Sequence, residues 1–155
     1  MTTMPAAVAR FLAARRIVVA GVSRQSSQPA NLIFRRLRDT GHEVFPVNPR
    51  TATVEGVTCY PGISSVPGPI EAVMVVTPAS EAADVVRRSA DHGATCVWFH
   101  RSFGTGSVSD EAVQACRHLG IDAIIGGCPM MVCEPVDVGH RCMRWWLQWR
   151  GRVPR

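Results

Sequence analysis

The sequence contains no lysine, so all 17 of its formal basic side chains are arginines. This absence excludes the phosphate-binding lysine of a Walker A loop, a Schiff-base lysine and the lysine of a protein kinase. Charged residues are also few, at 19% of the chain, whereas 46% of the residues are hydrophobic. This balance is typical of a globular protein and not of a disordered one. With 155 residues, the chain is long enough for one domain with a substantial core.

Long hydrophobic runs are also missing. No apolar run approaches the roughly 20 residues that a membrane span needs. Arg10, Arg15 and Arg16 interrupt the apolar residues near the amino terminus, which disfavours a secretory signal. We therefore expect a cytoplasmic protein without a membrane partner. In that setting, we expect the six cysteines to form no structural disulfides, with Cys96 and Cys116 as small core residues.

Apolar strands and amphipathic helices alternate along the chain. The periodicity predicts strands at 17–20, 43–47, 72–77, 96–99 and 121–125, and helices at 5–15, 29–39, 80–92 and 110–118, with residues 57–60 as a small strand or a loop. Ser80 and Ser109 are the expected N-caps of the last two helices. The strands are continuously apolar, which is typical of a parallel sheet covered on both faces. The predicted fold is α/β, a Rossmann-like, doubly wound, parallel five-stranded sheet in a single domain.

Ligands of such sheets bind beyond the carboxyl ends of the strands, near the point where the strand order reverses. The first of these ends is the most informative. The β-branched run from Ile17 to Ala20 stops at Gly21, and Val22 and Ser23 lead into a polar loop and a helix. Such a turn brings backbone N–H groups and a positive helix end together, which suits a phosphate. The second and third glycines of the dinucleotide fingerprint are missing, so a purely structural turn remains an alternative.

The second strand ends in Asn48, Pro49 and Arg50. Dinucleotide sites usually place a carboxylate there for the ribose hydroxyls. At these three positions an arginine stands instead, which disfavours NAD and favours a ligand whose ribose carries a phosphate, such as coenzyme A or NADP. An NADP-linked reductase therefore stays an alternative, although lysine is absent and Tyr60 is the only tyrosine available as a proton donor.

Four short motifs together resemble a known family. They are the stretch from Val19 to Ser23, the stretch from Phe45 to Pro49, the triplet 97–99, and Cys128 with Pro129. In their order and spacing they resemble the small bacterial CoA-binding domain proteins, which are similar to the nucleotide-binding domain of the succinyl-CoA synthetase α-subunit. The likeness covers roughly residues 14 to 134. The phosphorylated histidine of the synthetase lies in a separate domain that this chain lacks, so its catalytic chemistry is not carried over.

The resemblance implies a stand-alone module that binds coenzyme A or an acyl-CoA and is more a binding protein than an enzyme. It implies that the first loop holds the pyrophosphate, that the second approaches the adenosine and its 3′-phosphate, and that the turn after the third strand lines the pantetheine side. The residues implied are Gly21, Val22, Ser23, Arg24, Asn48, Pro49, Arg50, Thr77 and Pro78, and Pro29, at the start of the helix that follows the first loop, is the tenth candidate. No catalytic residue and no metal ligand is assigned.

Two other constellations give weaker alternatives. Cys128, Cys133, His140 and Cys142 form a loose cluster, but their spacing lacks the C-x-x-C knuckle of a zinc site. Cys128 near the cleft could instead act in redox chemistry or be an inert buried thiol. His100, after the fourth strand, could serve with Ser23 in a hydrolytic triad, although the only acidic candidates nearby in sequence lie in or at the start of helices.

Residues 135–155 form a tail rich in tryptophan and arginine, beyond the predicted CoA-binding domain at 1–134. As a helix, the segment would place Cys142, Trp145, Trp146 and Trp149 on one face. We expect these tryptophans to pack on the domain or at a contact between copies of the chain, which would make a homo-oligomer. A ligand-independent interaction protein that uses this tail is the third alternative. Nucleic-acid binding is not expected, because no binding motif accompanies the arginines.

Overall fold

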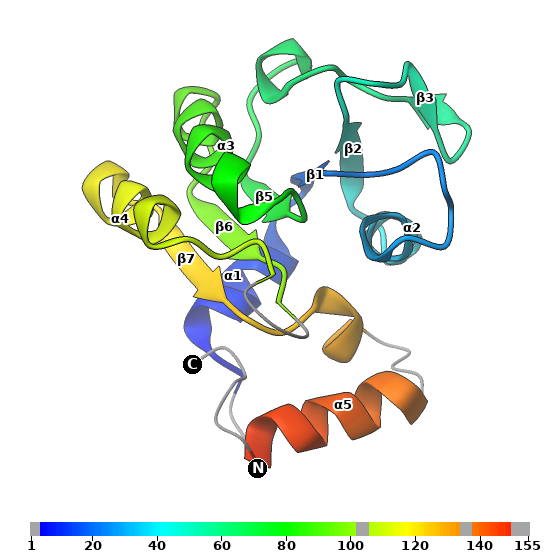
Figure 1. The fold of residues 1–155 in the computed structure, drawn as a ribbon, viewed down its shortest axis with the longest axis vertical. Helices are drawn as coiled ribbons and strands as arrows, with labels where there is room; N and C mark the ends of the chain where they lie inside the picture. Colours follow the sequence, from blue (N-terminus) through cyan, green and yellow to red (C-terminus); the bar gives the residue numbers. More distant parts are fainter. Residues whose placement is uncertain (1–3, 102–105, 134–137, 150–155) are drawn as a thin grey trace.

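The computed structural model describes residues 4–101, 106–133 and 138–149 (Figure 1). Its elements, in chain order, are α1 (Ala6–Ala13), β1 (Arg16–Ala20), α2 (Pro29–Asp39), β2 (Glu43–Val47), β3 (Thr53–Val54), β4 (Val57–Thr58), the 3₁₀ turn η1 (Ile63–Ser65), β5 (Ala72–Val75), α3 (Ala79–Asp91), β6 (Cys96–Phe99), α4 (Asp110–Leu119), β7 (Asp122–Ile125), the 3₁₀ turn η2 (Pro129–Met131) and α5 (Val138–Trp149).

The main sheet is parallel throughout, in the order β2-β1-β5-β6-β7. The chain moves outward from β1 to β2 and then returns to place β5 on the other side of β1. The strand order therefore reverses between β1 and β5. In open α/β sheets a ligand binds outside the carboxyl ends of the strands at this point. The loops that follow Ala20, Val47 and Val75 are the ones that meet there.

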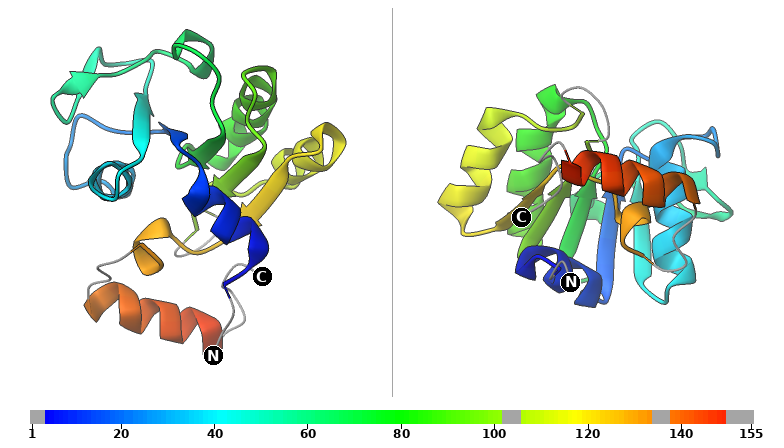
Figure 2. Two further views of the ribbon diagram at one scale, coloured as in Figure 1. Left: turned by 180° about the vertical axis from the view of Figure 1, so that it is seen from behind. Right: turned by 90° about the horizontal axis from the view of Figure 1, so that it is seen from below.

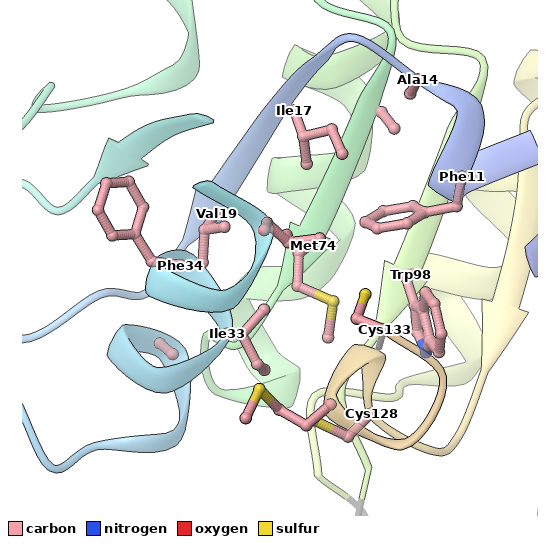
Figure 3. Close-up of a cluster of buried hydrophobic side chains, with 14 of the residues drawn as sticks. Phe11, Ala14, Ile17, Val19, Ile33, Phe34, Met74, Trp98, Cys128 and Cys133 are labelled. Carbon is pink, nitrogen blue, oxygen red and sulfur yellow. The ribbon is translucent and has the colours of Figure 1, made fainter. Parts of the chain in front are cut away.

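The apolar strands are continuous because both faces of the sheet are covered. Ile17, Val19 and Met74 face a cluster formed with α1, α2 and η2, part of which is drawn in Figure 3. Val18 and Val73, one position along, face a second cluster formed with α3 and α4. Successive side chains of a strand point to opposite faces of the sheet, so a strand that is buried on both faces has apolar residues at every position. The arrangement is a three-layer α/β/α sandwich.

Helix α1 covers the sheet at the end away from the candidate ligand side. Phe11 meets the ring of Trp98 edge to face, with ring centroids 5.1 Å apart (Figure 3). Both residues are fully buried, and the Trp98 indole nitrogen donates to the carbonyl of Gly126 at 2.9 Å. This aromatic pair fixes α1 on β6 and satisfies the only polar atom of the buried indole.

The predicted fold class is confirmed, and each of the five predicted sheet strands is present in the structure. Two local predictions are wrong. The N-cap of α3 is Pro78, without a side-chain hydrogen bond, and Ser80 lies inside the helix, because the fixed φ of proline starts the helix earlier. The strand expected at 72–77 ends at Val75. By contrast, the Ser109 cap is confirmed, since its side chain accepts from the Ala112 amide.

Helix α5 packs against η2 and lies at the margin of the molecule in Figure 1 and in the left view of Figure 2. Trp146 packs against the first core cluster, and the guanidinium of Arg144 donates to the carbonyl of Met131 at 3.1 Å. Trp145 and Trp149 face away, with 70% and 76% of their surface exposed. Among the described residues, no helix is both long and apolar enough to cross a membrane.

Candidate functional site

The loop after β1 depends on Gly21. Its φ of +101° lies in the region that favours glycine, and it approaches the chain after β5 very closely. A Cβ at this position would stand 2.8 Å from the carbonyl carbon and oxygen of Val76 and 2.9 Å from the amide nitrogen of Thr77. Those are backbone atoms that cannot rotate away. Glycine therefore allows the loops after β1 and β5 to meet where the strand order reverses.

Asn31 holds the same loop from the first turn of α2. Its Oδ1 accepts the backbone N–H of Ser23 at 2.8 Å, and its Nδ2 donates to the carbonyl of Ser23 at 2.7 Å. The side chain is 1% exposed, so these bonds are shielded from water. The Ser23 hydroxyl in turn accepts the backbone N–H of Gln25 at 3.1 Å. These hydrogen bonds fix the conformation of the loop.

The loop after β2 is tied to the loop after β1 by Asn48. Its Nδ2 donates to the carbonyl of Val22 at 2.6 Å, and its Oδ1 accepts the backbone N–H of Arg50 at 2.7 Å. The amide of Gly21 continues the ladder by donating to the carbonyl of Val47 at 3.0 Å. One side chain therefore fixes the relative position of the two loops that were predicted to hold the ligand.

A cleft of about 300 Å³ opens between these two loops. Its lining residues are Ser23, Arg24, Ser26, Asn31, Thr51, Thr53, Val54 and Glu55. Among the residues described, the backbone amides of Arg24, Ser26 and Ser27 donate a hydrogen bond to no protein group. These residues lie in the loop that directly precedes the N-terminus of α2. Such amides, together with the positive end of α2 and the exposed Arg24, favour an anionic group.

Thr77 stands beside Gly21 on the other side of the reversal point. Its hydroxyl oxygen is buried and has no hydrogen-bond partner among the residues that the structure describes. Buried polar atoms nearly always have a partner, so this hydroxyl, two residues after β5, is a candidate to form a hydrogen bond with a bound group. Pro78 follows it as the N-cap of α3 and is exposed.

The ten predicted site residues are thus distributed unevenly. Ser23 and Arg24 line the cleft, whereas Gly21, Val22, Asn48 and Thr77 build the loops around it. The other four do not line it: Pro29 begins α2, Pro49 and Arg50 are exposed on the loop after β2, and Pro78 begins α3. Contact of any of them with a ligand stays a prediction.

Sequence reasoning missed one side chain in the cleft. The hairpin of β3 and β4 brings the Glu55 carboxylate to the loop after β1, although the end of the second strand itself has no acidic residue. Its Oε1 accepts from Asn31 Nδ2 at 2.9 Å and from Arg35 Nη1 at 2.8 Å. These bonds and the Arg35 charge hold the pKa of the Glu55 carboxyl below its usual value, with the Asn31 bond as the largest cause. The carboxylate is therefore ionised at neutral pH.

The metal and redox alternatives gain no support from the structure. In the part of the chain that is described, no three His, Cys, Asp or Glu side chains gather as a metal site would require. Cys128 and Cys133 are buried, and burial raises the pKa of the Cys128 thiol to about 12. A thiol with such a pKa stays protonated at neutral pH and is a poor nucleophile.

The alternative of a hydrolytic triad with Ser23 and His100 also gains no support from the structure. His100 follows β6, which is separated from β1 by β5, so that strand spacing alone places it roughly 10 Å from the first loop. Burial lowers the pKa of its imidazole. A base needs hydrogen-bond contact with its nucleophile, and a separation of roughly 10 Å between His100 and the first loop is too long for one.

The terminal segment is helical, as the spacing of its tryptophans indicated. Cys142, Trp145 and Trp149 are exposed, whereas Trp146 is half-buried and packs against the first core cluster. Within the described chain, therefore, only one of these three tryptophans packs on the domain. A contact between copies of the chain through the exposed pair stays a prediction.

Comparison with known proteins agrees with this fold. The uncharacterized protein YneT of Bacillus subtilis is 26% identical over 114 residues, which are 74% of this chain and 82% of that protein. The α-subunit of an ADP-forming acetate–CoA ligase II of Pyrococcus furiosus is 32% identical over 69 residues, but these are 44% of this chain and only 15% of the subunit. A hypothetical protein from Pyrococcus horikoshii OT3 has a similar structure, with a TM-score of 0.73 at 25% identity over 83% of this chain and 92% of that one.

The family match covers the whole of the sheet and every loop described above. It extends over residues 15–134, from the start of β1 to just beyond η2, and leaves α1 and α5 outside. The described site lies entirely within the matched range. This chain belongs to the CoA binding domain family.

Proposed function

We propose that this protein binds coenzyme A or an acyl-CoA as a stand-alone module, with the pyrophosphate at the turn between β1 and α2. The cleft between the loops after β1 and β2 carries this proposal, because it is open, polar and lined by Arg24 at the point where the strand order reverses. Family membership supplies the class of ligand. The related acetate–CoA ligase subunit acts on CoA in a much longer protein.

The residues present fit such a ligand in three respects. Gly21 lets the backbone of the first loop approach that of the loop after β5, which brings these two loops together at the point where the strand order reverses. The exposed guanidinium of Arg24 supplies positive charge. The orphaned hydroxyl of Thr77 would find its partner in the pantetheine chain, which carries amide groups. In the proposed arrangement, residues 1–134 hold the ligand and residues 135–155 form an extension.

Binding is tested first by thermal unfolding with CoA, acetyl-CoA, ADP and NADP⁺. At a concentration of 100 times Kd, a ligand stabilises the native state by about 2.7 kcal/mol, which raises the Tm by about 5–11 °C for a chain of this size. We expect this rise with CoA and acetyl-CoA. An unchanged Tm at millimolar CoA would contradict the proposal, and a rise with NADP⁺ alone would favour the reductase.

Arg24→Ala tests the site with little risk to the fold, because the side chain is exposed. Loss of a charge-assisted contact costs about 1.5–3 kcal/mol, or roughly a 10- to 100-fold loss of CoA affinity by calorimetry. Arg117→Ala, an equally exposed arginine on α4, is the matched control and should leave the affinity unchanged. Equal affinities of the two variants would place the ligand elsewhere.

Arg50→Ala tests the proposed contact with the 3′-phosphate. The variant should lose affinity for CoA, by roughly 10-fold or more, and retain its affinity for dephospho-CoA, which lacks this phosphate. Equal weakening toward both ligands would show that Arg50 does not contact the 3′-phosphate.

A further inference from the structure

Glu55 occupies an unusual backbone conformation at the mouth of the cleft. It is the first residue of the two-residue turn between β3 and β4, with a φ of +51°, and Gly56 follows with a φ of +76°. Among the described residues, it is the only one besides glycine with a positive φ. Such turns are normally made by Asn or Asp followed by Gly. A long acidic side chain at a strained position commonly marks a functional constraint.

The surrounding contacts fix the carboxylate in one place. The side chain of Glu55 is only 13% exposed, and its Oε1 accepts from both Asn31 and Arg35. Arg35 is anchored in turn, since its Nη1 also donates to the carbonyl of Ser26 at 3.0 Å. The second oxygen, Oε2, accepts from no group among the described residues. The cleft therefore contains one immobilised carboxylate with one oxygen left to accept a hydrogen bond.

Among the residues that the structure describes, Glu55 is also the only acidic one that lines the cleft. It shares the lining of the cleft with Arg24, Thr51 and Thr53, and it belongs to the segment that follows β2. In parallel α/β sheets, the ribose of a bound nucleotide lies beyond the end of this strand. The chain thus supplies through a hairpin the carboxylate that the strand end itself lacks.

We infer that Glu55 determines specificity at the ribose: its Oε2 accepts a ribose hydroxyl, and its fixed charge opposes a phosphate on that same ribose. This inference rests on the proposed function. Arg24 in the cleft and Arg50 on the neighbouring loop attract a ribose phosphate, and the Glu55 carboxylate, whose charge Arg35 offsets in part, counteracts them. The balance between CoA and its dephosphorylated form is therefore set by Glu55 on one side and by arginines such as Arg50 on the other.

The experiment is calorimetric titration of the wild-type protein and of Glu55→Gln with CoA and with dephospho-CoA. Glutamine keeps an oxygen for the Asn31 bond and removes the charge. The ratio of the two affinities should shift in favour of CoA by about 5- to 10-fold, the size expected for removal of one charge at a distance of several ångströms in a partly solvated site. Glu111→Gln, in an exposed ion pair on α4, is the matched control and should leave the ratio unchanged.

Glu55→Asn serves as a second variant, because Asn followed by Gly56 is the preferred sequence for this turn and will keep the hairpin folded. It should shift the ratio in the same direction as Glu55→Gln. If both ligands bind and neither variant changes the ratio, the role of Glu55 is refuted while the proposed function stands. If the wild-type protein binds neither ligand, both inferences fall together.

Discussion

Replacing Gly21 by alanine tests the close approach on which the candidate site is built. The new Cβ would stand 2.8 Å from the carbonyl carbon and oxygen of Val76, and at a φ of +101°. Two separate contributions therefore add to the loss of folding free energy. A residue with a Cβ at positive φ costs about 1–2 kcal/mol, less a fraction of this that alanine recovers by restricting the unfolded chain. Forcing packed backbone apart costs about 1–3 kcal/mol more.

Gly41 offers a matched control for the first cost. Its φ is +96°, and a Cβ there would meet nothing within 4 Å. Gly41→Ala should therefore destabilise the native state by about 1 kcal/mol, from the backbone alone. Gly21→Ala should destabilise it by about 2–4 kcal/mol. The difference between the two variants isolates the contact between the loops after β1 and β5.

Urea denaturation followed by circular dichroism measures both values. For a chain of this size, 1 kcal/mol corresponds to about 2–4 °C in Tm, so thermal unfolding gives an independent check. We expect Gly21→Ala to lower the Tm by about 4–16 °C and Gly41→Ala by about 2–4 °C. Equal losses in the two variants would refute the close approach and with it the structural reason for glycine at position 21.

Three further outcomes follow from the described contacts. Asn31→Ala should cost about 2–4 kcal/mol in urea denaturation, because it removes three buried hydrogen bonds and leaves the Ser23 amide without a partner; a loss below 1 kcal/mol would contradict this. The pKa of Glu55 is lowered from 4.5, so its stabilisation is present above that pH and disappears as the pH falls through the lowered value. The stability difference between wild type and Glu55→Gln should therefore shrink between pH 7 and pH 3, and a constant difference would refute the role of the charge. In alkylation followed by mass spectrometry, exposed Cys142 should react quickly and Cys128, whose pKa is about 12, only on unfolding; equal rates would contradict the burial of Cys128.

Most of the architecture could be predicted from the sequence because it depends on local patterns. Runs such as Ile17 to Ala20 are apolar at every position, and a strand buried on both faces needs no other signal. The Ser109 cap was predictable for the same reason, since a serine before two acidic residues is a local signature. The prediction of Ser80 as an N-cap was wrong because Pro78, two residues earlier, also fits the start of a helix and fixes φ.

The candidate site was predictable only in part. Gly21 and Ser23 stand directly after a strand, so their place at the reversal point follows from the fold. Glu55 gives no such signal, because its partners Asn31 and Arg35 are 24 and 20 residues away and a Glu-Gly pair is not a usual hairpin turn. The terminal helix shows a similar limit. The spacing of its tryptophans describes a helical surface but does not say which side of it meets the domain.

The positions of the four tryptophans determine what intrinsic fluorescence can report about this protein. Trp98 is fully buried beside Phe11, whereas Trp145 and Trp149 are in contact with solvent. Two of the four emitters therefore fluoresce as free indole does in water whether or not the chain is folded, and acrylamide will quench them first. None of the four lines the cleft between the loops after β1 and β2. Intrinsic emission will follow the melting of the core through Trp98, whereas a ligand that enters the cleft touches none of the four emitters and should change their fluorescence little.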